Sequence, residues 1–361
     1  MGVAEFDPNF ALNPNVDVSE LVWLDAAEPP FVTYGAVSKA PYLRMPLSIA
    51  KTVSEGVHYL AKNTAGIRLR FRTDSPYIAI RCQWERQERL ANMTALGVSG
   101  FDLYTVSPDH SQHLLGPVFV PPVLAEHGYA SVCRVAPEMQ DYILNFPLYN
   151  GVEKLYIGVH RDAKFETPAT YTNSLPVVFY GSSITQGGCA SRPGNCYQNY
   201  LSRMLDMDYV NLGFSGCGKA EDAMVAYLKD LPMSVFVSDY DYNAPNPDYL
   251  RETHHKMYRA IREANPVLPY IMVSKPNHYG VATDIARRQV IMESYLQAKA
   301  TGDENVYFID GASFFAGEEF DAHMVDGCHP NDLGFYKMAK GMYPLLHKLL
   351  VLSRGGWFVG N

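Results

Sequence analysis

The sequence has few cysteines, no long apolar run and no excess of positive charge, and each of these shortages excludes a class of protein. Six cysteines without a C-x-x-C pair are too few for a disulfide scaffold in 361 residues. No apolar run approaches the roughly 20 residues that cross a bilayer, so we expect no membrane span. A formal charge of −8 gives no net electrostatic attraction to a phosphate backbone, and nucleic-acid binding is therefore disfavoured.

The N-terminal residues do not read as a secretory signal peptide. Residues 1–7 contain no basic region, and no apolar region follows them. The protein is therefore cytoplasmic, or it is secreted or periplasmic and a leader has been removed; the sequence leaves both open. Cys189 and Cys196 are close enough in the chain to form a bridge, but buried reduced thiols are the more usual state of such cysteines.

Composition and length indicate a folded protein of two domains. Hydrophobic residues make up 47% and charged residues 19% of the chain, which is typical of a globular protein. A length of 361 residues exceeds that of most single domains. Residues 162–174 are polar and rich in threonine. We therefore expect a linker there, between a domain at residues 1–165 and a second domain at residues 175–361.

Residues 1–165 show the patterns of antiparallel β-structure. Residues 67–72 alternate apolar and basic side chains, which predicts a strand with one buried face. The N-G pair at 150–151 separates the apolar runs 142–149 and 152–159, which predicts a β-hairpin with a type I′ turn. Several short strands of this kind indicate a β-sandwich of jelly-roll type, and only residues 47–62 show a helical period.

Residues 175–361 alternate short apolar strands with helical patterns. Strands that are apolar throughout are typical of a parallel sheet with helices on both faces. We therefore predict a three-layer αβα domain of about five parallel strands, with a site at the carboxyl ends of the strands. The predicted strands are 176–180, 209–212, 234–238, 270–274 and 306–309, and helices are expected around 197–205, 250–261 and 333–350.

A serine follows the first predicted strand of this sheet, where side chains can reach the crevice. Ser183 lies in the stretch Y-G-S-S-I-T-Q-G at 180–187, and its small neighbours let the backbone turn sharply. A serine hydroxyl becomes a strong nucleophile only when a base removes its proton. The serines of this loop could also simply cap a helix, so the segment alone does not decide its role.

A carboxylate and an imidazole occur three residues apart near the C-terminal end. Asp326 and His329 can face the same side of a turn, so that the carboxylate orients the imidazole while the other ring nitrogen faces Ser183. A D-x-x-H pair is also common on protein surfaces, and Asp321 and His323 compete locally for the same roles. The G-x-S-x-G elbow of α/β-hydrolases is absent.

The sequence contains no recognisable cofactor or metal motif. The glycine-rich loops at 181–188 and 213–218 match neither the phosphate-binding loop nor the dinucleotide fingerprint. There is no H-E-x-x-H motif and no cluster of cysteines and histidines, so we expect neither a cofactor nor a metal ion. His254 and His255 are adjacent, and because neighbours on a helix face different directions, we interpret both as surface residues.

Taken together, these segments resemble the SGNH or GDSL-like hydrolase family. The G-D-S block of that family resembles G-S-S at 181–183, and its asparagine–glycine block resembles N-L-G-F-S-G at 211–216. Its third block resembles D-Y-D-Y-N at 239–243, and its D-x-x-H block is matched at 326–329. The blocks occur in the family order, each after the expected strand or before the last helix. The joint match is far more specific than any single block.

The resemblance implies the residue roles of a serine hydrolase. Ser183 would attack an ester carbonyl, His329 would take the proton of the serine, and Asp326 would orient His329. The backbone N–H groups of Ser183 and Gly216, together with the side-chain amide of Asn243, would form the oxyanion hole.

Alternatives stay open for the oxyanion hole, and two positions depart from the family pattern. Gly213 could replace Gly216 as a donor, and Asn243 could be an ordinary turn asparagine. Ser182 stands where the family has aspartate, so other groups must organise the backbone behind the nucleophile. Asp241 stands where a glycine is usual, and we expect it and its tyrosine neighbours to crowd the crevice.

The resemblance extends to residues 1–165. The stretch G-F-D-L-Y at 100–104 resembles the G-x-D-L-Y signature of a bacterial subgroup with a β-rich domain in front of the hydrolase domain. This order of domains is similar to that of carbohydrate O-deacetylases. The 25 tyrosines would suit sugar rings, although most tyrosines are simply packed. The first domain could bind glycan, shape the cleft or mediate a homo-oligomer, and the sequence does not choose among these roles.

We therefore predict a serine esterase that hydrolyses short acyl esters, acetyl above all, on a carbohydrate through an acyl-serine intermediate. Its expected partner is a small-molecule or glycan ester. Two alternatives remain: a lipid or thioester acyl hydrolase, and a non-catalytic carbohydrate-binding protein on the same scaffold, which the serine at position 182 keeps open.

Overall fold

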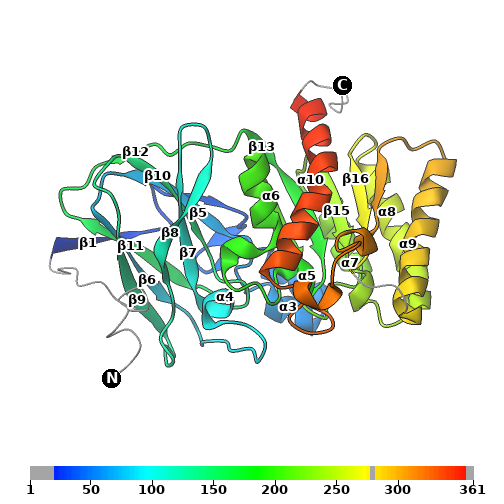
Figure 1. Ribbon diagram of the computed structural model, residues 1–361, viewed down its shortest axis with the longest axis horizontal. Coiled ribbons are helices and arrows are strands. Elements are labelled where there is room, and N and C mark those ends of the chain that lie inside the picture. Colours follow the sequence, from blue (N-terminus) through cyan, green and yellow to red (C-terminus); the bar gives the residue numbers. More distant parts are fainter. Residues whose placement is uncertain (1–19, 277–280, 355–361) are drawn as a thin grey trace. The chain divides into compact units, whose positions relative to one another are not determined.

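The computed structural model describes residues 20–276 and 281–354, which belong to two compact units (Figure 1). The first, called the sandwich unit below, comprises residues 20–43, 62–170 and 191–194. The second, called the α/β unit, comprises residues 44–61 and 171–190 and the described residues from 195 onward. Neither unit is continuous in sequence. Residues 1–7, on which the prediction about a leader rests, lie outside the described residues.

The sandwich unit contains two large antiparallel sheets that share an apolar core, and a small sheet of β3 (Ser38–Lys39) and β4 (Tyr42–Leu43). The first sheet has the order β1-β11-β6-β9, with bounds Leu21–Asp25, Lys154–His160, Tyr77–Gln83 and Gly128–Arg134. The second has the order β12-β5-β10-β7-β8, with bounds Phe165–Glu166, Arg68–Thr73, Gln140–Asn145, Phe101–Val106 and Gln112–Phe119, and β2 (Val32–Tyr34) also pairs with β5. Phe71 and Leu144 from one sheet share a buried core with Ile80 and Ile157 from the other. This confirms the predicted β-sandwich.

Strand β5 has the predicted alternation, but both of its faces are buried. Leu69 and Phe71 lie in the apolar core, while Arg68 and Arg70 on the opposite face are 1% and 0% exposed. The Arg68 guanidinium donates to the carbonyl oxygen of Gly66 at 2.5 Å. The prediction of a single buried face was therefore wrong, because a basic side chain can be buried when its N–H groups find acceptors.

The predicted hairpin at Asn150 and Gly151 is also absent, because β10 and β11 lie in different sheets and residues 146–153 cross between them. Asn150 makes long-range contacts instead. Its side-chain oxygen accepts the N–H of Glu88 at 2.7 Å, and its carbonyl accepts the hydroxyl of Thr64 at 3.0 Å. Gly151 forms a single antiparallel bridge with Asn63. These distant partners replace the local turn that the N-G pair favours.

The α/β unit contains one sheet of five parallel strands in the order β14-β13-β15-β16-β17. This sheet confirms the predicted strands and their parallel arrangement. Their bounds, in that order, are Met207–Gly213, Asn173–Gly181, Val235–Asp239, Tyr270–Val273 and Val306–Ile309.

Helices cover both faces of this sheet, as a three-layer αβα domain requires. On one face, Tyr180 and Met272 pack in a core with side chains from α2, α3, α7, α8 and α9. On the other face, Phe179 contacts Tyr197 of α6, and Tyr197 stacks on Phe335 of α10. The helix bounds are Leu47–Val53 for α2, Glu55–Leu60 for α3, Tyr197–Leu205 for α6, Asp222–Leu228 for α7, Pro247–Ala264 for α8, Ala282–Ala300 for α9 and Asp332–Arg354 for α10.

The early segment Arg44–Ala61 belongs to the α/β unit. Arg44 is fully buried, and its guanidinium donates to the carbonyl oxygens of Leu60 at 2.7 Å, Asn211 at 3.1 Å and Gly213 at 2.7 Å. The two carbonyls at 211 and 213 belong to the end of β14. One buried cation therefore ties the end of α3 to the strand that precedes a predicted site loop.

Helix α8 corrects the interpretation of the two adjacent histidines. His254 is 1% exposed, and its ring stacks on Tyr240 with centroids 5.8 Å apart. Burial lowers the pKa of His254 to about 3, so this ring stays neutral. The surface interpretation was wrong for His254, because the buried face marked by Leu250 and Met257 includes this position. No helix in the described part of the chain combines the length and the apolar character that a bilayer crossing requires.

Candidate active site

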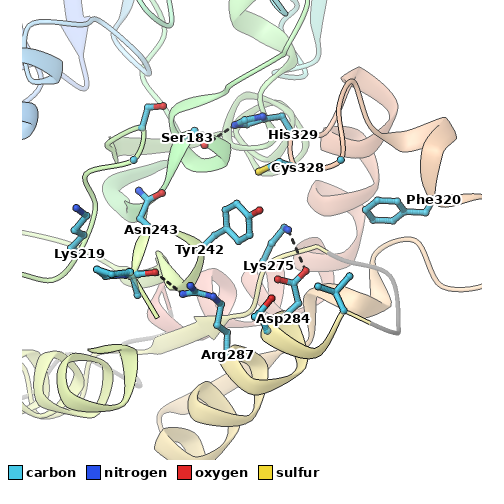
Figure 2. A pocket seen from close by; sticks show the side chains of 17 residues that line it. Ser183, Lys219, Tyr242, Asn243, Lys275, Asp284, Arg287, Phe320, Cys328 and His329 are labelled. Carbon is cyan, nitrogen blue, oxygen red and sulfur yellow. Dashed lines mark hydrogen bonds and ion pairs between the residues drawn. The ribbon is translucent and has the colours of Figure 1, made fainter. Parts of the chain in front are cut away.

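Three loops after neighbouring strands carry the residues that the sequence singled out. Ser183 follows β13, Gly216 follows β14 and Asn243 follows β15. Because these strands are adjacent and parallel, their carboxyl ends place the three loops at the same edge of the sheet. Figure 2 shows Ser183, Asn243 and His329 on one side of a cavity that all three line.

A short helix fixes the backbone at Ser183. Ser183 is the first residue of α5 (Ser183–Gln186), and the Ser182 hydroxyl caps this helix by accepting a backbone N–H at 3.2 Å. The glycine before it cannot carry a side chain, because a Cβ at Gly181 would lie 2.1 Å from the carbonyl oxygen of Asp239. The Ser183 side chain is thus presented from a rigid strand-to-helix turn.

His329 connects Ser183 to Asp326. Its Nε2 lies 2.9 Å from Ser183 Oγ, and its Nδ1 lies 3.1 Å and 3.0 Å from the two carboxylate oxygens of Asp326. The carboxylate is held in place because it also accepts the backbone N–H groups of Cys328 at 2.9 Å and His329 at 2.7 Å. In this arrangement a carboxylate can orient an imidazole that takes a proton from a hydroxyl. The structure brings the three residues together, and their catalytic roles stay a prediction.

The local competitor His323 is engaged away from Ser183. It is 1% exposed, with Nδ1 2.8 Å from the carbonyl oxygen of Glu319 and Nε2 2.9 Å from the carboxylate of Glu318. Its ring stacks on Phe315. Both ring nitrogens therefore have partners outside the site.

Gly216 and Asn243 remain the candidates for oxyanion donors beside the serine N–H. Gly216 is exposed and has a φ of +70°, a conformation that favours glycine. The Asn243 amide donates one hydrogen to the carbonyl oxygen of Phe214 at 2.8 Å, which orients the amide group. Its second N–H can then donate to an oxyanion. Gly213 is not a suitable substitute, because its N–H donates to the side-chain oxygen of Asn211 at 2.9 Å. The oxyanion assignment itself stays a prediction.

Asp239 supports the loop in which Ser182 replaces the usual aspartate. The Ser182 N–H donates to the carbonyl of Asp239 at 3.1 Å, and the Thr185 hydroxyl donates to its carboxyl group at 3.2 Å. Burial, and then the neighbouring Asp241, raise the pKa of Asp239 well above its usual range. The Asp239 carboxyl group thus stands behind the serine loop, and the loop keeps hydrogen-bond partners although position 182 is a serine.

Asp241 itself does not enter the crevice. Its side chain is 3% exposed and accepts the backbone N–H of Lys275 at 3.1 Å. Burial raises its pKa to about 6. Of the residues expected to crowd the crevice, Tyr242 does line the cavity, whereas Asp241 is absent from its wall.

A cavity of about 780 Å³ lies beside Ser183, a size suited to a small-molecule ligand. Among the described residues that line it, four side chains are charged, those of Lys219, Lys275, Asp284 and Arg287. The Lys275 ammonium lies 3.3 Å from the Asp284 carboxylate and 3.7 Å from the centroid of the Tyr242 ring. In Figure 2, Tyr242 lies between Ser183 and the group formed by Lys275, Asp284 and Arg287, whereas Lys219 lies on the side of Asn243.

Sequence reasoning missed Cys189, which lies beside the candidate triad. Its sulfur, a carboxylate oxygen of Asp326 and a ring nitrogen of His329 lie within 4.8 Å of one another. Cys189 is 7% exposed and has a φ of +73°, which is unusual for a residue other than glycine. Burial, and then the charges of Asp326 and Cys328, raise its pKa to about 12, so the thiol stays protonated.

The cysteine states agree with the expectation of reduced thiols. Cys189 and Cys196 are both free and buried, as the sequence favoured. Within the described residues, Cys189, Asp326 and His329 are also the one group whose donor atoms a metal ion could share, although the carboxylate and imidazole already bond to each other.

Two family models match the chain. The GDSL-like lipase/acylhydrolase model matches residues 174–347, and the model for the N-terminus of SGNH-hydrolase-type esterases matches residues 21–165. No curated protein matches the chain.

Several solved structures are similar over most of the chain. A Bacteroides ovatus protein provisionally assigned as a GDSL-like lipase is 29% identical, with a TM-score of 0.82 over 91% of this chain and 98% of its own. A salicylyl-acyltransferase from a tetracycline biosynthetic pathway is 19% identical, with a TM-score of 0.76 over 92% and 98%. A family two carbohydrate esterase from Clostridium thermocellum is 12% identical, with a TM-score of 0.60 over 89% and 98%. At these last two identities the likeness concerns the fold alone.

Proposed function

Because the chain belongs to the GDSL-like lipase and acylhydrolase family, we propose that it is a serine esterase that removes short acyl groups, acetyl above all, from a carbohydrate. The observation that carries the proposal is the continuous contact from Ser183 Oγ to His329 Nε2 at 2.9 Å and from His329 Nδ1 to Asp326 at 3.0 Å. Activity as an esterase follows from the family; the residue roles and the carbohydrate acetyl ester are the finer parts of the proposal.

The proposed reaction has two halves that use the same groups. His329 takes the proton of Ser183 as the oxygen attacks the ester carbonyl, and the resulting oxyanion accepts the N–H groups of Ser183, Gly216 and Asn243. The imidazolium then gives its proton to the leaving alcohol, which leaves an acyl-serine. Water, deprotonated by His329, attacks the acyl group, and Ser183 recovers its proton as the carboxylic acid departs. Asp326 keeps the imidazole in the tautomer that both halves need.

The cavity supports a polar substrate over a fatty acyl chain. Its wall includes the cations Lys219 and Arg287 and the amide of Asn243, beside apolar side chains such as those of Val281 and Phe320. Hydroxyl groups of a sugar can satisfy charged and amide groups, whereas an alkyl chain would leave them without water or partners. Solved carbohydrate esterases share this fold, which is consistent with the proposal.

The capping role of Ser182 weakens the non-catalytic alternative. That alternative depends on the loss of the usual aspartate, yet Ser182 caps α5 and the loop bonds to Asp239. The contact between Ser183 and His329 is intact in the presence of this serine.

An ester-length series tests the proposal and separates it from its rivals. We expect kcat/KM to be highest for p-nitrophenyl acetate and to fall through butyrate, octanoate and dodecanoate, with acetate released from an acetylated oligosaccharide. A maximum at octanoate or longer would instead support a lipid hydrolase. Failure to turn over any ester, together with failure of a fluorophosphonate to label Ser183, would support a binding protein.

A second serine of the same cavity provides a matched control. Ser215 lines the cavity and adjoins Gly216, but its hydroxyl has no place in the proposed reaction. Ser215→Ala should keep fluorophosphonate labelling and turnover within about tenfold of the wild type, whereas Ser183→Ala should lose both. Equal loss in the two variants would contradict the assignment of the nucleophile.

A further inference from the structure

Lys219 is a cation on the cavity wall to which the proposed reaction gives no role. It is half-buried and lines the same cavity as Ser183. Within the part of the chain that the structure describes, its ammonium group forms no ion pair and no hydrogen bond with another side chain. A charge that is partly withdrawn from water is stabilised most when an opposite charge meets it, so this position suits an anionic group that enters the cavity.

The backbone around Lys219 is held on both sides of its side chain. The Tyr249 hydroxyl donates to the Lys219 carbonyl at 3.1 Å, and the N–H of Ala220 donates to the Tyr180 hydroxyl at 2.8 Å. Ala220 has a φ of +55°, a left-handed conformation that residues other than glycine keep only where their surroundings impose it. Lys219 is therefore presented to the cavity by a fixed turn of the α/β unit, unlike a lysine on a loose surface loop.

This turn lies beside a proposed oxyanion donor. A Cβ at Gly218 would lie 3.5 Å from the amide nitrogen of Asn243, so the residue before Lys219 approaches that amide closely. Figure 2 shows Lys219 on the same side of the cavity as Asn243. An anionic group held by Lys219 would therefore belong to the molecule whose ester carbonyl reaches Ser183.

The other charges of the wall do not neutralise Lys219. Asp284 is the one carboxylate among the described lining residues, and it pairs with Lys275 at 3.3 Å. Arg287 donates to two backbone carbonyls, and its charge acts on the buried Asp241 carboxyl group, which lies outside the wall. Three cations and one carboxylate thus leave the described wall with an excess of two positive charges.

Glu221 offers Lys219 an alternative, purely structural role. Burial raises the pKa of Glu221 above its ordinary value, and the Lys219 charge is among the influences that lower it in part. The two side chains form no ion pair within the described residues, and Glu221 does not line the cavity. A structural role for Lys219 would appear as a loss of stability, whereas a role in binding would appear in the choice of substrate.

We propose that the cavity takes an ester whose molecule carries a carboxylate, and that Lys219 binds this carboxylate with Arg287 as a second cation. Hydrogen bonds between such charged groups are roughly twice as strong as neutral ones. A net charge of −8 would repel an anion from the protein as a whole, so the positive wall is a local exception to it. The inference rests on the proposed function and deepens it, because the acetylated sugar would then be an acidic one, such as a uronic acid.

Two esters that differ in one charge test the proposal. Methyl glucuronoside and methyl glucoside, each acetylated at the same secondary hydroxyl, differ only in a carboxylate in place of a hydroxymethyl group. From acetate release we expect kcat/KM to favour the glucuronoside ester about tenfold or more. Sodium chloride should lower this ratio between about 50 mM and about 500 mM, because salt screens the attraction. A ratio near one at low salt would overturn the proposal.

Substitution of Lys219 has a matched control. Lys219→Gln should lower the ratio about tenfold, and Lys219→Arg, which keeps the charge, should hold it within about threefold. Lys229 is also a half-buried lysine of the α/β unit, but it does not line the cavity, so Lys229→Gln should keep the wild-type ratio. Equal ratios in Lys219→Gln and Lys229→Gln, or a lower melting temperature of Lys219→Gln with an unchanged ratio, would overturn the proposal.

A second pair of esters locates the carboxylate, which could belong to the sugar or to the acyl group. Monoethyl succinate and ethyl butyrate have acyl groups of equal carbon number, and only the first carries a charge. A preference for the glucuronoside ester that depends on Lys219 places the anion on the sugar. A preference for monoethyl succinate that depends on Lys219, without one for the glucuronoside ester, keeps the anion site but places the anion on the acyl group.

Binding without turnover separates this inference from the proposed function. Calorimetric titration with methyl glucuronoside and with methyl glucoside, neither of them acetylated, needs no reaction. If the wild type hydrolyses no ester but binds the glucuronoside more tightly in a way that Lys219→Gln abolishes, the anion site stands and the proposed function fails. If the glucoside ester is hydrolysed as fast as the glucuronoside ester, the proposed function stands and the inference is overturned.

Discussion

Polar side chains occupy two different settings that can be compared, one at the cavity of the α/β unit and one inside a strand of the sandwich unit. In the α/β unit, Ser183 and His329 lie beyond strand ends and border a cavity. In the sandwich unit, Asp102 lies within a strand, has no exposure and meets Arg192 from another segment of the chain. A polar group beyond a strand end can reach a substrate, whereas a polar group within a strand can only fix other parts of the protein.

A substitution at one of these settings should therefore have an effect that can be separated from a substitution at the other. Groups at the cavity should alter turnover and leave stability nearly unchanged, because they hold little of the core together. Groups inside the strands should alter stability, because a buried charge that loses its partner costs several kcal/mol.

Ser183→Ala should show the largest loss of activity. Without the attacking oxygen, turnover of p-nitrophenyl acetate should fall on the order of 10⁴-fold or more. The melting temperature should stay within a few degrees, because the side chain makes its contact with His329 and lies at a cavity. Steady-state kinetics measure the loss of turnover, and a thermal melt on the same sample measures the melting temperature. A large drop in melting temperature would break the separation.

Asp326→Asn should have the next largest effect. The amide can still accept the backbone N–H groups of Cys328 and His329, but it cannot stabilise the charged imidazolium. Because the Asp326 side chain is 38% exposed, water compensates in part, and we expect kcat to fall on the order of 10²- to 10⁴-fold. An unchanged kcat would mean that His329 is oriented by the loop alone.

Asn243→Ala should lower kcat about 10²- to 10³-fold through the loss of one oxyanion donor. The control is Asn246→Ala, three residues further along. Asn246 caps α8 by accepting the N–H of Tyr249 at 2.9 Å, so its loss should cost about 1 kcal/mol of stability with activity kept. The pair compares a functional and a structural asparagine in one loop. Similar kcat values for the two variants would remove Asn243 from the proposed mechanism.

Asp241→Asn should change stability in a pH-dependent way. The folded pKa of about 6 lies above the ordinary value of 3.8, so the stability linked to this group is present below about pH 4 and is lost as the pH rises through 6. Asparagine carries no charge to bury. The variant should therefore gain on the wild type as the pH rises from 4 to 7, by about 3 kcal/mol at most.

Denaturant unfolding of both proteins at pH 4, 5, 6 and 7 measures this difference. A difference in unfolding free energy that does not vary with pH would show that Asp241 is not the titrating group. Asp241 belongs to the α/β unit but is buried away from the cavity, so its substitution should change stability through burial and not through the site.

The parallel sheet could be predicted from the sequence because its evidence is local. Each strand is an apolar run, and the loops after three adjacent strands carry the site residues. His254 could also have been placed in the core, since it lies four residues after Leu250 and three before Met257 on one helix face. The helical periodicity thus already indicated a buried position for His254, but the neighbouring His255 suggested a pair of surface residues.

The features that the sequence did not reveal depend on distant partners. The hairpin expected at Asn150 fails because Glu88 and Thr64 bind this residue from elsewhere in the chain. The ion pair of Asp102 with Arg192 joins residues from two separate stretches, and no periodicity marks either of them. Such pairings follow from the three-dimensional arrangement alone.

The α/β unit is discontinuous in sequence, and this affects how it can be expressed alone or transplanted into another protein. A fragment that began at residue 171 would leave behind the buried cation at Arg44 and the apolar side chains of Ala50, Val57 and Leu60, all of which help to fill one side of that unit. Such a piece would expose a gap in its own interior and would be expected to aggregate. The α/β unit therefore cannot be moved between proteins as one continuous fragment, and a transplant must include residues 44–61.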